Sequence, residues 1–323
     1  MKPGFVTVLL TTYNGDEYLV EQLDSIVQQT YKDLEIIICD DASKDQTRKI
    51  IEKYKNQDSR IKVIFNNTNI GLHANLSNGF KISTGEYIAI SDQDDVWKKD
   101  KIEKLLACLG KKSAVYSNSL LIDHEGNSLG ISVLDCIRVK CPDQHHNLTG
   151  LFSKNCVSAH ALLFRRELLN IFLPFRKDII FDHQIAFAAA LLNGLSFCQD
   201  PLVYHRIHGK NHTNSNLVVR KKKRLSSDVR RQKKRSRLRG RIGSIIDAYE
   251  RILANNYCPA KVNEDLMNRF QNIYSLLEYK SNKRFHWKLF LSMLLLHYKH
   301  AEYSRHFNFK KSIAAARNFR AFE

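Results

Sequence analysis

Apolar and polar positions follow a repeating order of buried strands and amphipathic helices through the first 122 residues. Nearly continuous apolar runs predict strands at residues 6–10, 34–39, 61–65, 87–91 and 114–122. Between them, apolar residues recur every three or four positions and predict helices around residues 19–27, 50–54, 72–82 and 102–109. Strands without a polar face need cover on both sides of their sheet. The pattern therefore predicts an α/β fold with a mainly parallel sheet flanked by helices.

Beyond residue 122 the chain first becomes polar and then returns to this alternation. Residues 123–149 carry few apolar runs, which predicts a loop. A strand, a helix and a second strand are then predicted at residues 159–164, 182–192 and 201–207. These elements complete the α/β layer.

Charge marks a boundary near Leu217. The chain has a formal net charge of +18, and thirteen Lys or Arg with a single Asp between Arg220 and Arg241 supply +12 of it. The sequence that follows has helical periodicity and few turn residues. We therefore predict an α/β domain over residues 1–217 and a basic, mainly helical region over residues 218–323.

The basic segment at residues 220–241 has three possible interpretations. Nucleic acid is a disfavoured partner, because no helix-turn-helix, zinc finger or aromatic-interleaved RNA motif accompanies the segment. Anionic lipid headgroups attract such clusters by about 1 kcal/mol per basic residue, and a solvated charged helix is the alternative without a partner. An apolar face in the tail either packs on the core, which we prefer, or contacts a membrane; it comprises Trp287, Leu289, Phe290, Met293 and Leu294.

The cysteines indicate neither a disulfide framework nor a zinc site. Seven are scattered along the chain without a CxxC pair, and this usage fits a reducing, cytoplasmic compartment. The longest apolar run of the tail, at residues 289–296, is far shorter than the ~20 residues that span a bilayer. We expect a cytoplasmic protein without a transmembrane helix, and peripheral attachment at the inner face of the membrane remains open.

Three polar clusters follow predicted strands at the point where each strand ends. They are TTYNG at residues 11–15, DDAS at 40–43 and SDQDD at 91–95. Ligands of open α/β sheets bind beyond the carboxyl ends of the strands, so we expect the clusters to converge on one crevice. Helix capping explains any single cluster well, since Asp and Ser are good caps, but it explains the three together poorly.

The third cluster places Asp92, Asp94 and Asp95 within four residues. Carboxylates so close repel one another unless a cation compensates their charge. Their oxygens suit hard divalent ions such as Mg²⁺ or Mn²⁺, which share their coordination with substrate phosphates. We therefore predict that this turn holds a metal ion against a diphosphate, with a solvated acidic turn as the alternative.

Taken in order, these clusters resemble the motifs of glycosyltransferase family 2. The resemblance rests on TTYNG, DDASKDQT and STGEYIAISDQDD and covers about residues 5–215. It implies a GT-A fold and transfer of a sugar from a nucleotide donor with Mn²⁺ or Mg²⁺. The SDQDDVW stretch is also similar to bacterial members that assemble polysaccharides, including rhamnosyltransferases.

On the donor side, the resemblance implies roles for residues of all three clusters. Thr11 and Tyr13 would line the nucleoside pocket, and Asp41 would accept a hydrogen bond from the base. Asp92 would contact the ribose or the metal shell, and Asp94 would coordinate the metal. The family's donor-side N-x-G segment is matched by Asn66, Gly71 and Asn75.

On the acceptor side, inverting transfer needs a general base. Asp182, at a predicted helix start, matches the family position for this base. Burial beside Phe181 would raise the pKa of Asp182. His183 is the local rival for the role, and a helix N-cap is the structural alternative for Asp182.

Further contacts are predicted near the metal. His208 ends a predicted strand and is similar to a histidine that some relatives use as a metal ligand, although thirteen histidines make coincidence easy. Arg206 is a second candidate there, as a partner of the donor phosphates. Asp95 is an additional candidate contact, and Trp97 either shapes the sugar or acceptor pocket or packs in the core.

Together these features predict an inverting glycosyltransferase that acts on a glycan or lipid-linked acceptor in cell-surface polysaccharide synthesis. The resemblance favours TDP-rhamnose and UDP-sugars as donors. A metal-dependent nucleotidyltransferase is one alternative, but the first cluster lacks a glycine-rich, basic phosphate loop. A non-catalytic protein that binds anionic surfaces would leave the acidic clusters unexplained. A dehydrogenase is excluded because no GxGxxG follows the first strand.

Overall fold

The computed structural model describes residues 2–140, 142–146, 148–209, 211, 227–257, 267–268, 270–271 and 274–275. The expected boundary near residue 217, the basic residues 220–226 and the apolar tail face at residues 287–294 lie outside this part of the chain.

Strands and helices alternate through the first half of the chain, as the periodicity predicts. The strands are β1 (Lys2–Thr12), β2 (Leu34–Asp40), β3 (Ile61–Phe65), β4 (Gly85–Ser91), β5 (Val96–Trp97) and β6 (Ala114–Ile122). The helices are α1 (Leu19–Val27), α2 (Thr47–Gln57), α3 (Leu72–Ile82) and α4 (Lys101–Leu109). On α1, Leu19, Leu23 and Ile26 recur at helical spacing and are fully buried, which fixes the face that the helix turns to the sheet.

The second half of the chain adds shorter elements. They are β7 (Ser128–Ser132), α5 (Val133–Cys136), α6 (Leu148–Ser153), β8 (Leu162–Arg165), α7 (Leu169–Phe172), α8 (Phe181–Leu191), β9 (Leu195–Arg206) and α9 (Ser227–Ala254), with 3₁₀ turns at Pro142–His145, Ala159–Ala161 and Arg166–Leu168. The prediction of a loop over residues 123–149 is wrong, because β7 pairs with β6 as an antiparallel hairpin and α5 follows it. Ser132 and Asp135 form a capping box at the start of α5. Four residues are too few for helical periodicity to reveal this helix.

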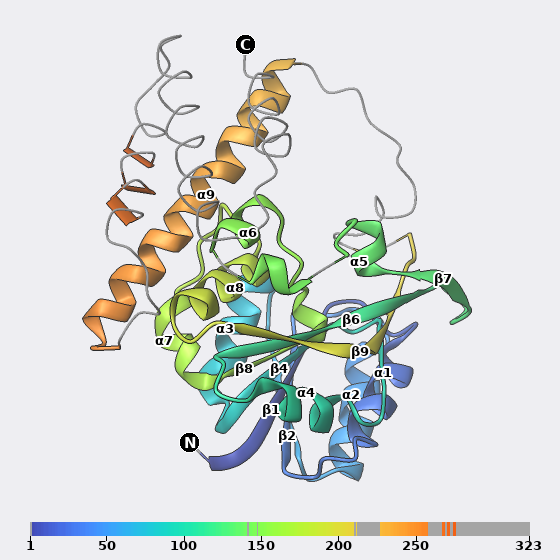
Figure 1. Ribbon diagram of the computed structural model, residues 1–323. Helices are drawn as coiled ribbons and strands as arrows, with labels where there is room; N and C mark the ends of the chain where they lie inside the picture. Colours follow the sequence, from blue (N-terminus) through green and yellow to red (C-terminus); the bar gives the residue numbers. More distant parts are fainter. Residues whose placement is uncertain are drawn as a thin grey trace.

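Within the described residues, nine strands form one curled sheet in the order β3-β2-β1-β4-β8-β6-β9-β5, with β7 beside β6 (Figure 1). Neighbours among β1, β2, β3 and β4 are parallel, as are β6 and β9. β8 lies antiparallel between β4 and β6. The predicted α/β fold with a mainly parallel sheet is confirmed. The carboxyl ends of β2, β1 and β4 therefore lie side by side at one edge.

Helices cover both faces of the sheet, and β1 contributes to a hydrophobic core on each side (Figure 1). Val8 and Leu10 pack with buried residues of α1, α2 and α4. Leu9, between them, points the other way and packs with residues of α3, α8 and α9. This two-sided burial is why the strand has no polar face.

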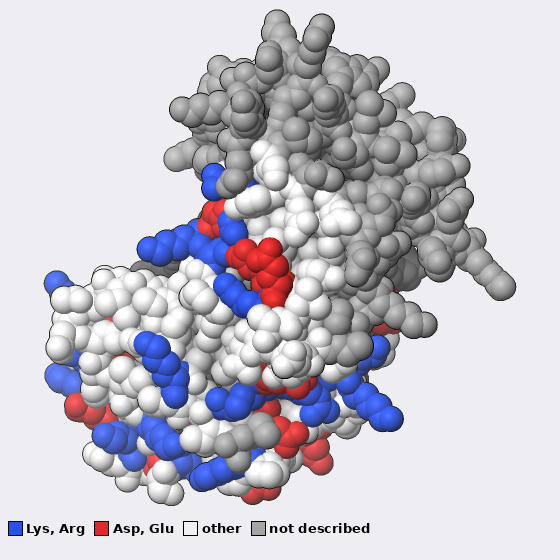
Figure 2. All heavy atoms as spheres, turned by 90° about the vertical axis from the view of Figure 1, so that its left-hand side faces the viewer, with Lys and Arg blue, Asp and Glu red and all other residues white. Residues whose placement is uncertain are grey.

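α9 packs on the α/β domain through an apolar stripe. Leu238, Ile242 and Ile245 of this helix are buried in one cluster with Phe181 and Ile185 of α8. On the face shown in Figure 2, Lys and Arg side chains are interspersed with Asp and Glu over the described surface. No helix in the described part of the chain combines the length and hydropathy needed to cross a bilayer.

Candidate active site

Three polar loops follow β1, β2 and β4 and lie against one another at this edge of the sheet. Tyr13 N donates to Oε1 of Gln93 at 2.8 Å, and Gln93 Nε2 donates back to Tyr13 O at 3.2 Å. Asn14 N donates to Oγ of Ser43 at 2.9 Å. The first loop is thus joined to the second and to the third, and the expected convergence of the three clusters is present.

Asp41 is buried at the start of the second loop and is fixed by the segment that precedes α3. Its carboxylate accepts hydrogen bonds from Ile70 N at 2.8 Å, Gly71 N at 2.9 Å and Asn66 Nδ2 at 3.1 Å. Asn66 Nδ2 also donates to Asn75 Oδ1 at 2.9 Å. Gly71 has a φ of 83°, a conformation that suits glycine. The donor-side segment and the second loop therefore form one hydrogen-bonded unit.

The two first-loop residues expected at a nucleoside differ in exposure. Thr11 is nearly buried within β1, whereas Tyr13 is 47% exposed beyond the strand end. An exposed aromatic ring at this edge offers a face on which a base can stack.

Asp94 and Asp92 are the partly exposed carboxylates of the acidic turn, with side chains 15% and 40% exposed. Asp94 Oδ2 is 2.8 Å from Nε2 of His208 and accepts a hydrogen bond from Asn211 Nδ2 at 3.2 Å. The turn after β4 is thereby tied to the chain just beyond β9. Partial desolvation of Asp92, together with repulsion by Asp95 and Asp94, raises the pKa of Asp92 to about 7. At neutral pH Asp92 is therefore balanced by a proton or by a cation.

Asp95 lies beneath the turn and is fully buried. Its Oδ1 is 2.7 Å from Nδ1 of His205 and accepts from Arg206 N at 3.2 Å, while Oδ2 has no hydrogen-bond partner among the described residues. Burial opposes its charge, but His205 and His160 lower the pKa of Asp95 to about 2. Burial likewise opposes the charge of His205, yet Asp95 raises the pKa of His205 to about 9. The two residues form a buried ion pair.

Two groups of side chains are candidates to receive a cation. The ligand atoms of Asp95, His160 and His205 all lie within 4.8 Å of one another. All three residues are buried beneath the turn, however, and Asp95 and His205 already contact one another at 2.7 Å. The outer group is Asp94 and His208, which present a carboxylate oxygen and an imidazole nitrogen 2.8 Å apart. Asp92 is the second outer carboxylate of the same turn. This donor set fits Mn²⁺, and its oxygens fit Mg²⁺.

Arg206 and Trp97, both candidates for substrate contact, are buried. The Arg206 side chain is 1% exposed, and it donates from Nε to Asp94 O at 3.1 Å and from Nη2 to Glu21 Oε2 at 2.5 Å. These internal bonds leave Arg206 holding the acidic turn rather than facing a donor phosphate. Trp97 is 2% exposed, and Nζ of Lys101 lies 3.2 Å from its ring centroid. Its position is that of a packing residue.

Asp182 and His183 occupy the first turn of α8. Asp182 is close enough to Asp92 for its charge to raise the pKa of that residue. Burial raises the pKa of Asp182 itself to about 7, and its Oδ1 is buried without a hydrogen-bond partner among the described residues. Burial, then Arg241 and Arg237, lower the pKa of His183 to about 3. Asp182 can therefore exchange a proton near neutral pH, while His183 stays neutral.

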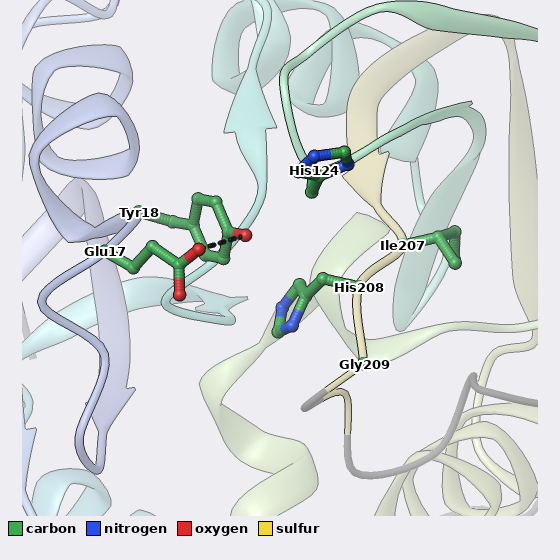
Figure 3. Close-up of a pocket in the computed structure, with 6 residues that line it drawn as sticks. All are labelled: Glu17, Tyr18, His124, Ile207, His208 and Gly209. Carbon is green, nitrogen blue, oxygen red and sulfur yellow. Dashed lines mark hydrogen bonds between the residues drawn. The ribbon is translucent and has the colours of Figure 1, made fainter.

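A pocket of about 300 Å³ opens beside this edge of the sheet (Figure 3). Its lining residues are Glu17, Tyr18, His124, Ile207, His208 and Gly209. The ring of Tyr18 lies 4.8 Å from that of His208, and Tyr18 OH donates to Glu17 Oε1 at 2.7 Å. His208 therefore lines the pocket with one face of its ring and contacts Asp94 through Nε2.

Sequence reasoning missed four residues that hold these loops in place: Gln93, Glu21, Asn211 and His205. Three of them lie within or beside predicted motifs, yet residue type alone does not reveal their partners. Leu202, Val203 and Arg206 of β9 are buried along with His205, so the apolar neighbours in the strand, and not an alternation, are the usable signal that His205 is buried. A buried histidine needs a hydrogen-bond partner, and an acidic turn offers one.

Comparison with known proteins agrees with this geometry. Residues 7–172, just over half of the chain, match the family described as Glycosyl transferase family 2. An uncharacterized glycosyltransferase of Haemophilus influenzae is 30% identical over 227 residues, which are 65% of this chain and 67% of that protein. The putative teichuronic acid biosynthesis glycosyltransferase TuaG of Bacillus subtilis is 36% identical over 112 residues, which are 35% of this chain and 44% of that protein.

Among solved structures, S. aureus TarS 1–349 in complex with UDP-GlcNAc superposes with a TM-score of 0.57 at 18% sequence identity. The superposition covers 91% of this chain and 80% of the TarS chain. This similarity shows the GT-A fold. Sequence match and fold agree, and the chain belongs to glycosyl transferase family 2.

Proposed function

We propose that this protein is a metal-dependent, inverting glycosyltransferase that moves a sugar from a nucleotide donor to a hydroxyl group of a glycan or lipid-linked acceptor. Family membership supports sugar transfer. The observation that carries the finer assignment is the contact between Asp94 and His208, 2.8 Å apart at the edge where the Tyr13 and Asp41 loops meet. Together with the hydrogen bonds that join the first and third loops, and with Asp182, whose charge reaches Asp92, this contact supports a cation, a nucleotide and a base acting at one site.

The nucleoside would lie across the carboxyl ends of β1 and β2. The exposed ring of Tyr13 would stack on the base beside Thr11. Asp41 already accepts three hydrogen bonds, but a carboxylate has about four lone-pair positions, which leaves room for a base N–H. Asp92, a partly exposed carboxylate of the acidic turn, would meet the ribose.

The diphosphate would lie at the acidic turn. Asp94 and His208 would hold Mn²⁺ or Mg²⁺, which supplies Lewis-acid stabilisation of the leaving nucleoside diphosphate. Arg206 supports this arrangement by its hydrogen bond to the Asp94 carbonyl oxygen. The ion pair of Asp95 and His205 anchors the turn from beneath.

Asp182 would act as the general base. It would take the proton of the acceptor hydroxyl as that oxygen attacks the anomeric carbon, while the bond to the nucleoside diphosphate breaks on the opposite face. A single displacement of this kind inverts the anomeric configuration. The raised pKa of Asp182, about 7, matches a base that works near neutral pH.

The names of similar proteins guide the choice of substrates. TuaG is named for teichuronic acid biosynthesis, which supports a role in cell-surface polysaccharide synthesis, and TarS was solved with UDP-GlcNAc. UDP-sugars and TDP-rhamnose are therefore the donors to test first. A cytoplasmic position against an anionic membrane surface, reached through the basic residues 220–241, would bring the enzyme to a lipid-linked acceptor.

Donor turnover tests the proposal. The protein is incubated with Mn²⁺ and, in turn, UDP-glucose, UDP-GlcNAc, UDP-galactose and TDP-rhamnose, and release of the nucleoside diphosphate is measured with and without a bacterial lipid extract. We expect slow hydrolysis of one donor, faster release with the extract, and a product of inverted configuration by NMR. Turnover of none of these donors, or a retained configuration, would contradict the proposal.

A further inference from the structure

Two arginines of α9 lie one helical turn apart beside the first turn of α8. Gly240, between Arg237 and Arg241, packs directly on the segment that leads into α8: a Cβ at this position would lie 2.5 Å from the carbonyl oxygen of Asp178 and 3.2 Å from Cβ of Ile179. The close approach of the two chains is possible because residue 240 has no side chain. It carries both arginines to within electrostatic reach of His183.

Among the residues that the structure describes, no acidic side chain pairs with this arginine pair. The nearby carboxylates of Asp178 and Asp247 form ion pairs with Arg176 instead, at 2.9 and 3.0 Å. Arg241 is half-buried, and its Nη1 donates to the carbonyl oxygen of Phe152 at 2.7 Å. Within the described residues, neither Arg237 nor Arg241 has an ion-pair partner.

An unbalanced pair of this kind is costly. Like charges four residues apart on a helix repel one another, and burial strengthens the repulsion because it reduces solvent screening. Consistent with this, burial and Arg237 lower the pKa of Arg241. Both arginines also act on half-buried His183, whose pKa is lowered first by burial and then by their charges. An anion that binds between them would relieve the repulsion.

We propose that Arg237 and Arg241 form an acceptor-side subsite for a phosphate or diphosphate group, so that the acceptor is a sugar linked through phosphate. The inference rests on the proposed function, because Asp182 defines the acceptor side. Guanidinium groups match phosphate oxygens with paired, charge-assisted hydrogen bonds. The donor diphosphate is accounted for at Asp94 and His208, so the arginine pair is available to a second phosphorylated ligand.

The NMR signals of the His183 side chain test the subsite locally. The full chain is titrated with inorganic pyrophosphate in metal-free buffer, where the acidic turn has no cation to attract an anion, and His183 is assigned with His183→Gln. We expect a saturable shift whose midpoint rises about tenfold or more in Arg237→Gln and in the double variant with Arg241→Gln. Arg239→Gln is the matched control, because Arg239 lies over the ring of Tyr274, with its guanidinium carbon 6.0 Å from the centroid.

Arg237 is exposed, so its single variant tests the subsite even if the double variant unfolds. No shift in the wild type, or equal midpoints in wild type and Arg237→Gln, would overturn the subsite. The rest of the basic segment would itself bind phosphatidylglycerol vesicles under the proposed function, so the decisive outcome is vesicle binding that weakens in Arg237→Gln. That result would assign the pair to lipid headgroups and overturn its acceptor role.

Transfer separates this inference from the proposed function. With the active donor, octyl glycosyl diphosphates are compared with octyl glycosides of the same sugars. The subsite predicts about tenfold or greater preference for the diphosphates, lost in Arg237→Gln, while donor hydrolysis stays unchanged. Equal use of both acceptor types would overturn the subsite and leave the proposed function standing. Absence of all donor turnover, with the pyrophosphate shift intact, would overturn the proposed function and leave the arginine pair as an anion site without an acceptor role.

Discussion

Nε2 of His208 lies 2.8 Å from Oδ2 of Asp94, although 114 residues separate the two in the sequence. The contact joins the end of β9 to the turn after β4 and presents an imidazole nitrogen beside a carboxylate oxygen. The Arg206 side chain donates to the backbone carbonyl oxygen of Asp94 in the same turn, and Asn211 donates to the Asp94 carboxylate. Asp94 is thus held in one position before any ligand arrives, which lowers the entropy lost when a cation binds.

Removing the Asp94 carboxylate is expected to abolish catalysis. Asp94→Ala should reduce donor turnover by about 1,000-fold or more, because the leaving diphosphate loses its stabilising charge. His208→Ala should have a smaller effect and raise the Mn²⁺ concentration needed for half-maximal rate. Asp33→Asn, at an exposed carboxylate far from the loops, is the control and should match the wild type. Initial rates over a Mn²⁺ series check this, and unimpaired turnover by Asp94→Ala would refute the metal assignment.

The rate should depend on pH through Asp182. Only its ionised form can accept a proton, so kcat/KM should rise about tenfold per pH unit below pH 7 and level off above it. Asp182→Asn should remove this dependence along with transfer, and should leave donor binding within about twofold. A pH series of initial rates, with donor affinity measured by calorimetry, makes the comparison. Near wild-type transfer by Asp182→Asn would mean that another group is the base.

The same substitution should make the protein more stable above neutral pH. The pKa of Asp182 is raised from 3.8 to about 7 in the folded protein, so folding opposes its ionisation and stability falls as pH rises between these values. Asn carries no charge to bury. Asp182→Asn should therefore unfold with a free energy about 2 kcal/mol higher at pH 8 and nearly unchanged at pH 4. Denaturant titrations at both pH values decide the point; a variant that is less stable at pH 8 would argue that the carboxylate is not desolvated.

His205 should matter for stability more than for chemistry. Its pKa is raised from 6.5 to about 9 by Asp95, so the ion pair contributes fully below pH 6.5 and is lost as pH rises through 9. His205→Gln should cost about 3 kcal/mol at pH 6, because Asp95 is left as a buried charge without its partner. The loss should shrink at pH 9.5. Equal losses at both pH values, measured by denaturant unfolding, would show that packing rather than charge explains the effect.

Much of this site follows from the sequence, and the remainder depends on strand order. Buried runs such as residues 34–39 and clusters at strand ends predict a sheet edge with three converging loops, and β1, β2 and β4 are neighbours as that requires. Helical spacing also places Asp182 at the start of α8. These inferences succeed because they use local periodicity and one general rule of α/β sheets.

The inner partners follow from long-range pairing instead. β9 is parallel to β6 and antiparallel to the short β5, and this arrangement brings His205 and Arg206 beneath Asp95 and Asp94. A two-residue strand has no periodicity of its own, so its pairing cannot be read from the sequence. For the same reason Arg206 looked available to a phosphate, whereas the folded chain uses its donors internally. The close packing of α9 on the segment before α8 depends likewise on Gly240. A single glycine in the sequence does not show which segment will pack against it.

Electron paramagnetic resonance of bound Mn²⁺ tests the central assignment most directly. Titration of the wild type with Mn²⁺ in the presence of the nucleoside diphosphate of the active donor should show one tight site, and omission of the nucleotide should weaken it. Asp94→Ala should lose this site, while Asp33→Asn should keep it. An unchanged tight site in Asp94→Ala, or full transfer by the wild type in excess chelator, would contradict a cation held by the acidic turn.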